Sequence, residues 1–243
     1  MKNEQYIQSC HSLRNELLGY LQRLTGRPAI AEELLQETLL RGHLHQAELP
    51  DSHVELRAWL FTVASRLAID TLRKHSNWRE NAMDDLREAA ESNADFINLS
   101  RQLIGTPETK NIAKEHLAAC FTCLLRTFPE QKAAALLLKE VYGFSVEEVA
   151  DQLETSFSQV KNWLQETRRT MNAIYGASCA LVTKNGVCHQ CVELDGFFAS
   201  NSSDPLAESP RDLQARLAVL HELRDKGMGR WHVLLFELLD ELS

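Results

Sequence analysis

The stretch that decides the fold is residues 144–165, which read FSVEEVADQLETSFSQVKNWLQ. Ser145, followed three residues later by Glu148, has the pattern of a capping box and predicts the start of a helix. A second start of the same kind follows at Ser156, with Gln159 in the corresponding position. Two short helices joined by a turn of about three residues are typical of a helix-turn-helix.

The second helix of this pair is expected to present polar and basic side chains outward, while Val160 and Leu164 face inward. In a helix-turn-helix protein this helix enters the major groove, where amide side chains pair with adenine, arginine pairs with guanine, and hydroxyl or cationic groups bind phosphates. The same pattern also fits a helical hairpin whose polar face is merely solvated. The candidate DNA-binding residues are Ser158, Gln159, Lys161, Asn162, Gln165, Arg168 and Arg169.

Upstream of this motif, apolar residues recur at helical spacing in three further segments. They predict helices at about 6–26, 30–46 and 54–76, the first two separated by a break at Gly26. Ten glycines and six prolines among 243 residues are few for a protein built from β-turns. The sequence therefore predicts an all-α fold.

The domain organisation follows from changes in composition along the chain. An acidic stretch of weak periodicity after the third helix indicates a linker. Beyond Gly176 the chain becomes rich in Gly, Ser and Asn, carries a cysteine cluster, and ends in an apolar helical stretch at about 211–242. The predicted organisation has two helical domains and a mostly helical C-terminal extension: a bundle at 1–78, a linker at 79–112, a helix-turn-helix domain at 113–176 and the extension at 177–243.

Charge and motif content exclude several classes of protein. A net charge of −8 argues against binding DNA through bulk electrostatics, so basic residues must gather on particular faces or a partner must supply affinity. No apolar run is long enough to span a bilayer, and the N-terminus lacks an apolar signal core, so we expect a cytoplasmic protein without membrane insertion. No glycine-rich phosphate loop or nucleophile elbow occurs, so we expect no enzymatic activity.

Two sets of motifs resemble a known family. Residues 31–41, AEELLQETLLR, and residues 57–74, RAWLFTVASRLAIDTLRK, together resemble the second conserved region of bacterial RNA polymerase sigma factors of the extracytoplasmic-function (ECF) group. Residues 128–131, FPEQ, and residues 141–150, VYGFSVEEVA, resemble the fourth region of the same group. The resemblance covers about residues 10–175 and leaves a C-terminal extension. It implies a sigma factor that binds core RNA polymerase and promoter DNA and initiates transcription.

The resemblance also implies roles for single residues. The helix at 30–41 would dock on the polymerase clamp, with Glu33, Gln36, Glu37 and Arg41 as contacts. The helix at 57–75 would face the promoter element upstream of the start site. The face at 30–41 also fits an ordinary solvated helix, and Trp59 also fits a core position. For this second helix the implied DNA-binding residues are Arg57, Arg66, Arg73 and Lys74 for phosphates, with Trp59 and Phe61 as aromatic surface for unstacked bases.

The chain departs from the family pattern in its helix-turn-helix. Glu154 stands in the turn where the family usually has glycine, at a cost of about 1 kcal/mol if the turn keeps a positive φ. The second helix is also less basic than usual, with Trp163 and Glu166 among its residues. These departures concern promoter sequence and affinity rather than the implied role.

The C-terminal extension holds three cysteines close together. Cys179, Cys188 and Cys191, with Gly186 in the turn between them, fit a site for zinc or another thiophilic metal with a fourth ligand from elsewhere. They equally fit reduced thiols that only pack the extension onto the body of the protein. No cofactor is otherwise required. The apolar helical end predicts that the extension either packs on the body of the protein as a regulatory cap or forms a surface for a partner. For a chain that resembles sigma factors, the resemblance implies self-inhibition in the first case and an anti-sigma factor as the partner in the second.

An alternative hypothesis is a one-component helix-turn-helix regulator with a metal- or redox-sensing tail. That class predicts stable dimers and operator binding by the chain alone. A sigma factor instead predicts tight binding to core polymerase and weak DNA binding alone.

Overall fold

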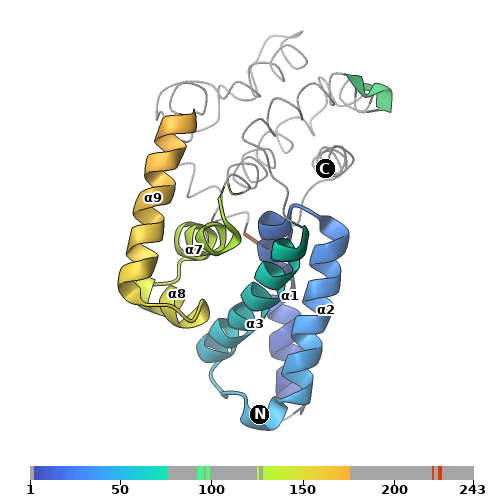
Figure 1. Cartoon of the computed structure of the whole chain (residues 1–243). Coiled ribbons are helices and arrows are strands. Elements are labelled where there is room, and N and C mark those ends of the chain that lie inside the picture. Colours follow the sequence, from blue (N-terminus) through green and yellow to red (C-terminus); the bar gives the residue numbers. More distant parts are fainter. Residues whose placement is uncertain are drawn as a thin grey trace, which may run out of the picture. The chain divides into compact units, whose positions relative to one another are not determined.

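A computed structural model describes residues 3–75, 92–95, 97–98, 125, 128–175, 221 and 224–225. Within these residues every element of regular structure is a helix, as the sequence predicted (Figure 1). The helices are α1 (Asn3–Thr25), α2 (Pro28–Leu44), the short 3₁₀ helix η1 (Gln46–Glu48), α3 (His53–His75), α7 (Glu130–Glu140), α8 (Val146–Gln152) and α9 (Phe157–Tyr175).

The first three helices begin and end within a few residues of the predicted bounds. Gly26, with φ 61°, ends α1, and Pro28 occupies the first turn of α2, where its missing N–H costs no hydrogen bond. The three helices pack on one another around Leu17, Leu21 and other apolar side chains that water does not reach. This arrangement gives α2 and α3 one buried face and one outward face each.

Two polar contacts fix the packing of α1. The buried Tyr20 and Ser65 hydroxyls lie 2.7 Å apart, joining α1 to α3. Tyr6 donates a hydrogen bond to the carbonyl of Leu39 at 2.7 Å, joining α1 to α2. Gly42 makes that approach possible, because a Cβ there would clash with the Tyr6 hydroxyl and come within 3.0 Å of its Cζ.

The helix-turn-helix has the predicted local geometry. Ser145 Oγ accepts a hydrogen bond from the Glu148 amide at 3.1 Å, and a Glu148 carboxylate oxygen accepts one from the Ser145 amide at 2.7 Å, which confirms the capping box. Glu154 has φ 49°, and the Thr155 amide reaches the Ala150 carbonyl at 2.9 Å, which is a Schellman closure of α8. The turn therefore keeps the left-handed conformation that favours glycine.

The chain divides into two compact units. The first comprises Met1–Ser76, Phe128–Gln165 and Arg224–Gly227, so α7 and α8 belong with α1–α3. The second comprises the remaining residues, of which the structure describes the end of α9 and a few residues at 92–98, 125 and 221. Most of the predicted linker at 79–112 and of the predicted extension at 177–243 lies outside the described residues, and the predicted domain boundaries stay a prediction.

Candidate nucleic-acid interface

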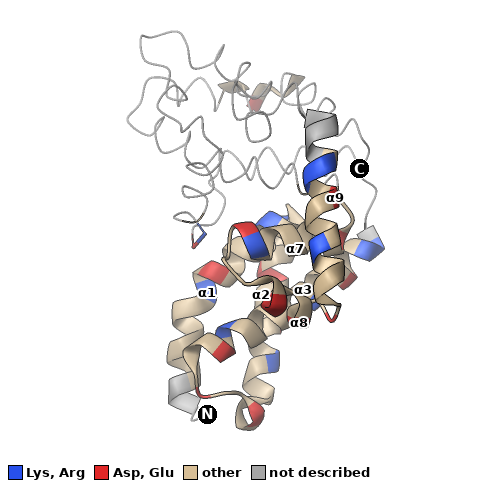
Figure 2. Ribbon diagram, turned by 90° about the vertical axis from the view of Figure 1, so that its left-hand side faces the viewer, with Lys and Arg blue, Asp and Glu red and all other residues tan. Residues whose placement is uncertain are grey.

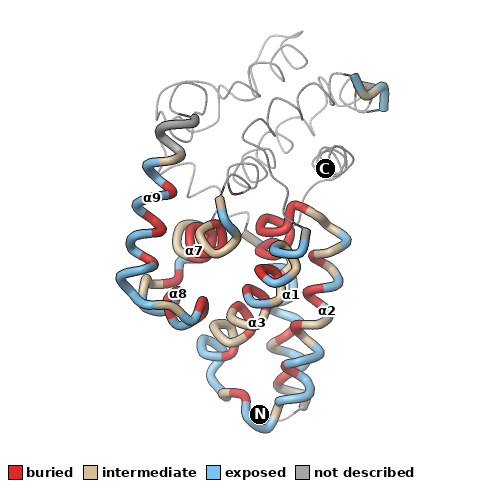
Figure 3. Tube along the Cα trace, in the orientation of Figure 1, coloured by how far each residue is buried: buried red, intermediate tan, exposed pale blue. Residues whose placement is uncertain are grey.

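The outward face of α9 carries all seven residues that the helix-turn-helix pattern selected. Ser158, Gln159, Lys161, Asn162, Gln165, Arg168 and Arg169 are exposed. In contrast Val160, Leu164 and Thr167 are buried, so buried and exposed bands alternate along the helix (Figure 3). In Figure 2 the positions of Lys and Arg appear as blue bands along the α9 ribbon.

The structure refines two details of this face. Trp163 is buried, so it does not lie on the outward face. Glu166 is exposed and is the departure from the family pattern that remains on this face. Phe157, which the sequence did not single out, is exposed in the first turn, with the Lys161 ammonium 4.7 Å from its ring centroid. Such a cation–aromatic pair at a helix start can stack on a base or a sugar while its charge binds a phosphate.

The four residues implied to contact polymerase form one outward strip of α2. Glu33, Gln36 and Arg41 are exposed, and Glu37 is half-buried. Arg41 donates to Glu37 at 2.7 Å, one helical turn earlier. The same helix also exposes two apolar side chains that sequence reasoning missed, Leu40 at 51% and Leu44 at 71% exposed. The strip thus combines charge with exposed apolar surface, a composition suited to a protein partner.

The implied DNA-binding residues of α3 differ in exposure and in the residues that they contact. Arg73 and Lys74 are exposed near the end of the helix, where Arg73 lies 3.9 Å from Asp70. Trp59 is half-buried. Arg66 is also exposed, but its guanidinium forms an ion pair of 2.7 Å with Glu154, in the turn of the helix-turn-helix.

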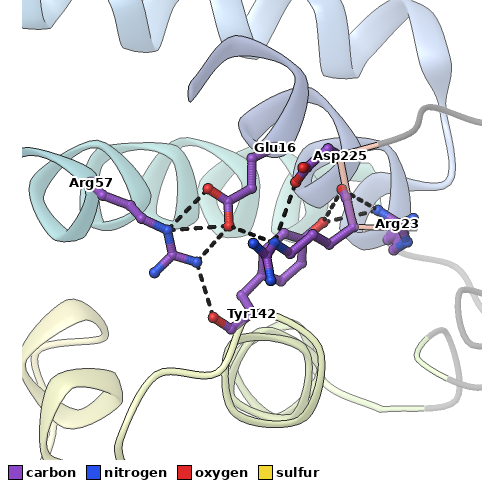
Figure 4. Close-up of polar contacts among 6 residues, drawn as sticks. Glu16, Arg23, Arg57, Tyr142 and Asp225 are labelled. Atoms are coloured by element: carbon purple, nitrogen blue, oxygen red, sulfur yellow. Dashed lines mark hydrogen bonds and ion pairs between the residues drawn. The ribbon is translucent and has the colours of Figure 1, made fainter. Parts of the chain in front are cut away.

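Arg57 is partly buried, and its guanidinium binds other residues of the protein. Its guanidinium binds both carboxylate oxygens of Glu16, at 2.6 and 3.0 Å, and donates to the main-chain carbonyl of Tyr142 at 2.9 Å (Figure 4). Its Cζ lies 4.2 Å from the Phe144 ring centroid. The resemblance implied that Arg57 presents its charge to a phosphate. In this structure Arg57 instead joins α1 and α3 to the segment between α7 and α8.

The prediction that Phe61 forms an aromatic surface is wrong for this structure. Phe61 is completely buried, with ring centroids 5.2 Å from Tyr142 and 5.1 Å from Phe144. Tyr142 also packs edge-on against Tyr20, at 5.3 Å. The physical reason is that α7 and α8 pack against α3 and cover the face that carries Phe61.

Tyr142 and four residues near it form what we call the junction cluster: Glu16, Arg23, Arg57, Tyr142 and Arg224. Arg23 donates to the Tyr142 hydroxyl at 2.9 Å and to the Arg224 carbonyl at 3.1 Å. The Arg224 Nε lies 3.5 Å from the Glu16 carboxylate. Burial raises the pKa of Tyr142 to about 12 although the Arg23 charge acts to lower it, so the phenol is neutral and can donate. The cluster joins parts of the chain that are far apart in sequence, and no local pattern marks it.

The predicted metal site consists of three cysteines of the C-terminal extension. Cys179, Cys188 and Cys191 lie outside the described residues, and among the residues that are described no three His, Cys, Asp or Glu side chains are grouped to hold a metal ion. No helix in the described part of the chain has the length and apolar character to cross a membrane.

Two family descriptions match the chain: Sigma-70 region 2 over residues 11–78, and Sigma-70, region 4 over residues 118–171. Residues 172–243 lie beyond both matches.

Three curated relatives are similar to the chain. The ECF RNA polymerase sigma factor SigJ of Mycobacterium tuberculosis is 28% identical over 169 residues, 69% of this chain and 50% of SigJ. The ECF RNA polymerase sigma factor SigM of Bacillus subtilis is 27% identical over 161 residues, 66% of this chain and 89% of SigM. The ECF RNA polymerase sigma factor SigL of M. tuberculosis is 38% identical over 106 residues, 42% of this chain and 59% of SigL. The matched part thus spans about half the length of SigJ and most of SigM.

Proposed function

Because the chain belongs to the ECF RNA polymerase sigma factors, we propose that it binds core RNA polymerase and directs it to promoters to initiate transcription. The observation that carries the proposal is the order of its parts. A region 2 bundle precedes a region 4 helix-turn-helix whose second helix exposes seven polar or basic residues. A sigma factor is not an enzyme, since nucleotide addition belongs to the polymerase and the sigma factor contributes binding.

We propose a division of these contacts between three helices. The outward strip of α2, with Glu33, Gln36, Glu37 and Arg41, would dock on the polymerase. The α9 face would enter the major groove of the upstream promoter element. Arg66, Arg73 and Lys74 of α3 would bind phosphates of the element nearer the start site. The polymerase would supply most of the affinity, which is how a protein with a net charge of −8 can act on DNA. The site of action would be the bacterial cytoplasm, where polymerase and promoter DNA are found.

The experiment is reconstitution of the full chain with core RNA polymerase on a genomic promoter library, with start sites as the readout. Discrete start sites that require the chain support the proposal. Operator binding by a stable dimer, without any polymerase binding, would instead favour a one-component regulator. Reversing charge at the α2 strip, as Glu33→Lys with Glu37→Lys, should weaken polymerase binding, while the control Glu147→Lys on the exposed face of α8 should not.

We also propose, from the sequence, that Cys179, Cys188 and Cys191 bind zinc or another thiophilic metal. Ligation would order a polar loop, so binding free energy would become folding free energy of the extension. The test is metal analysis of protein purified without added metal, compared with the Cys188→Ser, Cys191→Ser variant. Equal metal content in the two proteins, or no metal in the wild type, contradicts the site.

We propose further that the C-terminal extension inhibits the chain from within, in place of a separate anti-sigma factor. The support is the position of Arg224, a residue of the extension that lies in the junction cluster with residues of both sigma regions.

A further inference from the structure

Two of the four basic side chains that α3 would offer to DNA contact residues of region 4. Arg57 donates to the Tyr142 carbonyl at 2.9 Å and lies against the Phe144 ring. Arg66 pairs with Glu154 at 2.7 Å. These contacts occupy donors of both guanidinium groups, so they compete with a DNA phosphate for the same groups.

An aromatic interface covers the same face of α3. Phe61 lies between Tyr20 of α1 and the Tyr142 and Phe144 rings, at centroid distances between 5.1 and 5.2 Å. A base cannot reach Phe61 while these rings cover it. The packing of region 4 on α3 therefore covers the Phe61 ring and engages the Arg57 and Arg66 guanidinium groups.

Arg224 connects the C-terminal extension to this interface. Its carbonyl accepts hydrogen bonds from Arg23 at 3.1 Å and from the Tyr142 hydroxyl at 3.4 Å. Its Nε lies 3.5 Å from Glu16, the carboxylate that also binds Arg57. One residue of the extension thus contacts region 2 through Glu16 and Arg23, and region 4 through Tyr142.

We propose that the structure is a closed form that excludes DNA from α3, and that Arg224 is the contact by which the extension holds region 4 on region 2. The inference rests on the proposed function, in which α3 binds DNA. It names the residues through which the C-terminal extension would inhibit the chain. Arg57 is the group that changes partner: its guanidinium donates to the Tyr142 carbonyl of region 4 in the closed form and to a DNA phosphate in the open form, while Glu16 of the same region remains beside it.

The energetic consequence is a reduced apparent affinity for DNA. When only a fraction of the protein is open, the measured dissociation constant rises by the inverse of that fraction. A substitution that weakens the closed form without touching Arg57 therefore tightens DNA binding. In the closed form Glu33, Gln36 and Arg41 of α2 remain exposed, so polymerase binding through α2 is expected to change little.

The test measures binding of the full-length chain, without polymerase, to a fluorescein-labelled random-sequence DNA duplex by fluorescence anisotropy at low ionic strength. Two variants open the form in different ways. Arg224→Glu places a carboxylate beside Glu16, and Tyr142→Phe keeps the ring but removes the hydroxyl between Arg23 and Arg224. We expect roughly tenfold tighter binding for Arg224→Glu and roughly fivefold for Tyr142→Phe. Adding Arg57→Gln to either variant should remove most of that gain.

A matched control separates opening from charge. Arg14→Glu makes the same change in net charge at an arginine whose partner is Glu32, in an exposed ion pair outside the junction cluster. Added negative charge by itself weakens DNA binding, so the control should bind the duplex no more tightly than wild type. Tighter DNA binding by Arg224→Glu therefore cannot come from its change in net charge.

Wild-type DNA affinity in both variants, with circular dichroism showing intact helices, overturns the proposal, as does a gain that survives Arg57→Gln. If Arg224→Glu does not fold, the uncharged Tyr142→Phe variant decides. The proposed function fails separately, through absence of polymerase binding by the wild type, because the duplex assay contains no polymerase.

Discussion

Replacing Glu16 with glutamine should lower the melting temperature by roughly 6–12 °C, because Arg57 then keeps its charge in a largely buried site without a carboxylate partner. The substitution preserves the shape of the side chain and removes only its charge. An amide also turns an NH₂ group toward the guanidinium, where donor would face donor.

The magnitude follows from burial. The Glu16 side chain is 9% exposed and the Arg57 side chain 22% exposed. Breaking a fully buried ion pair by removing one partner costs about 3–5 kcal/mol, and the partial exposure of Arg57 places this pair at about 3 kcal/mol. For a chain of this size each kcal/mol shifts the melting temperature by roughly 2–4 °C.

The assay is thermal unfolding followed by circular dichroism, in a double-mutant cycle of Glu16→Gln and Arg57→Gln. The double variant should lose less than the sum of the two single variants, because the second substitution removes the uncompensated charge. Glu32→Gln and Arg14→Gln form the control cycle, since that pair is 43% and 46% exposed and should be worth about 0–1 kcal/mol. A Glu16→Gln variant no less stable than Glu32→Gln would refute the reasoning.

Three further predictions concern other sites. Gly42→Ala should lower the free energy of unfolding in urea by about 1–2 kcal/mol, since overpacking against Tyr6 exceeds the gain in helix propensity. The loss should be smaller in a Tyr6→Phe background, and an equal loss there would contradict the clash. Glu154→Gly should stabilise by up to about 1 kcal/mol and Glu154→Val should destabilise, because φ is 49° there; equal stability of the two variants would rule out strain in the turn. In transcription with core polymerase, Lys161→Ala should weaken all promoters alike, whereas Gln159→Ala should change sequence preference by about 1–3 kcal/mol at one base; unchanged promoter selection would mean that α9 does not read the groove.

Local signals in the sequence were sufficient for the helices and the helix-turn-helix. The capping box at Ser145 and Glu148 and the turn at Glu154 each depend on atoms a few residues apart. The spacing of apolar residues likewise predicted α1, α2 and α3 to within a few residues. Such features are encoded where they form, so a single sequence reveals them.

The contacts of Arg57 and Phe61 could not be predicted in this way. On a helix considered alone, Arg57 is a basic side chain suited to a phosphate and Phe61 an aromatic side chain on an edge of the apolar stripe. Their partners Tyr142 and Phe144 come from a segment about 80 positions later, and nothing near α3 indicates which face that segment covers. Leu40 was overlooked for a related reason, since its exposure depends on which helices pack against α2.

The contacts between Phe61, Tyr142 and Phe144 also make the closed form depend on temperature. Separating these rings would hydrate apolar surface, and the stabilisation that apolar burial provides weakens on cooling. The desolvation penalty of the Glu16–Arg57 pair falls as temperature rises, so the ion pair also stabilises the closed form less at low temperature. Both contributions make the closed form weakest in the cold. Chilling the free protein, well short of unfolding it, should therefore release region 4 from region 2 and increase its binding to DNA.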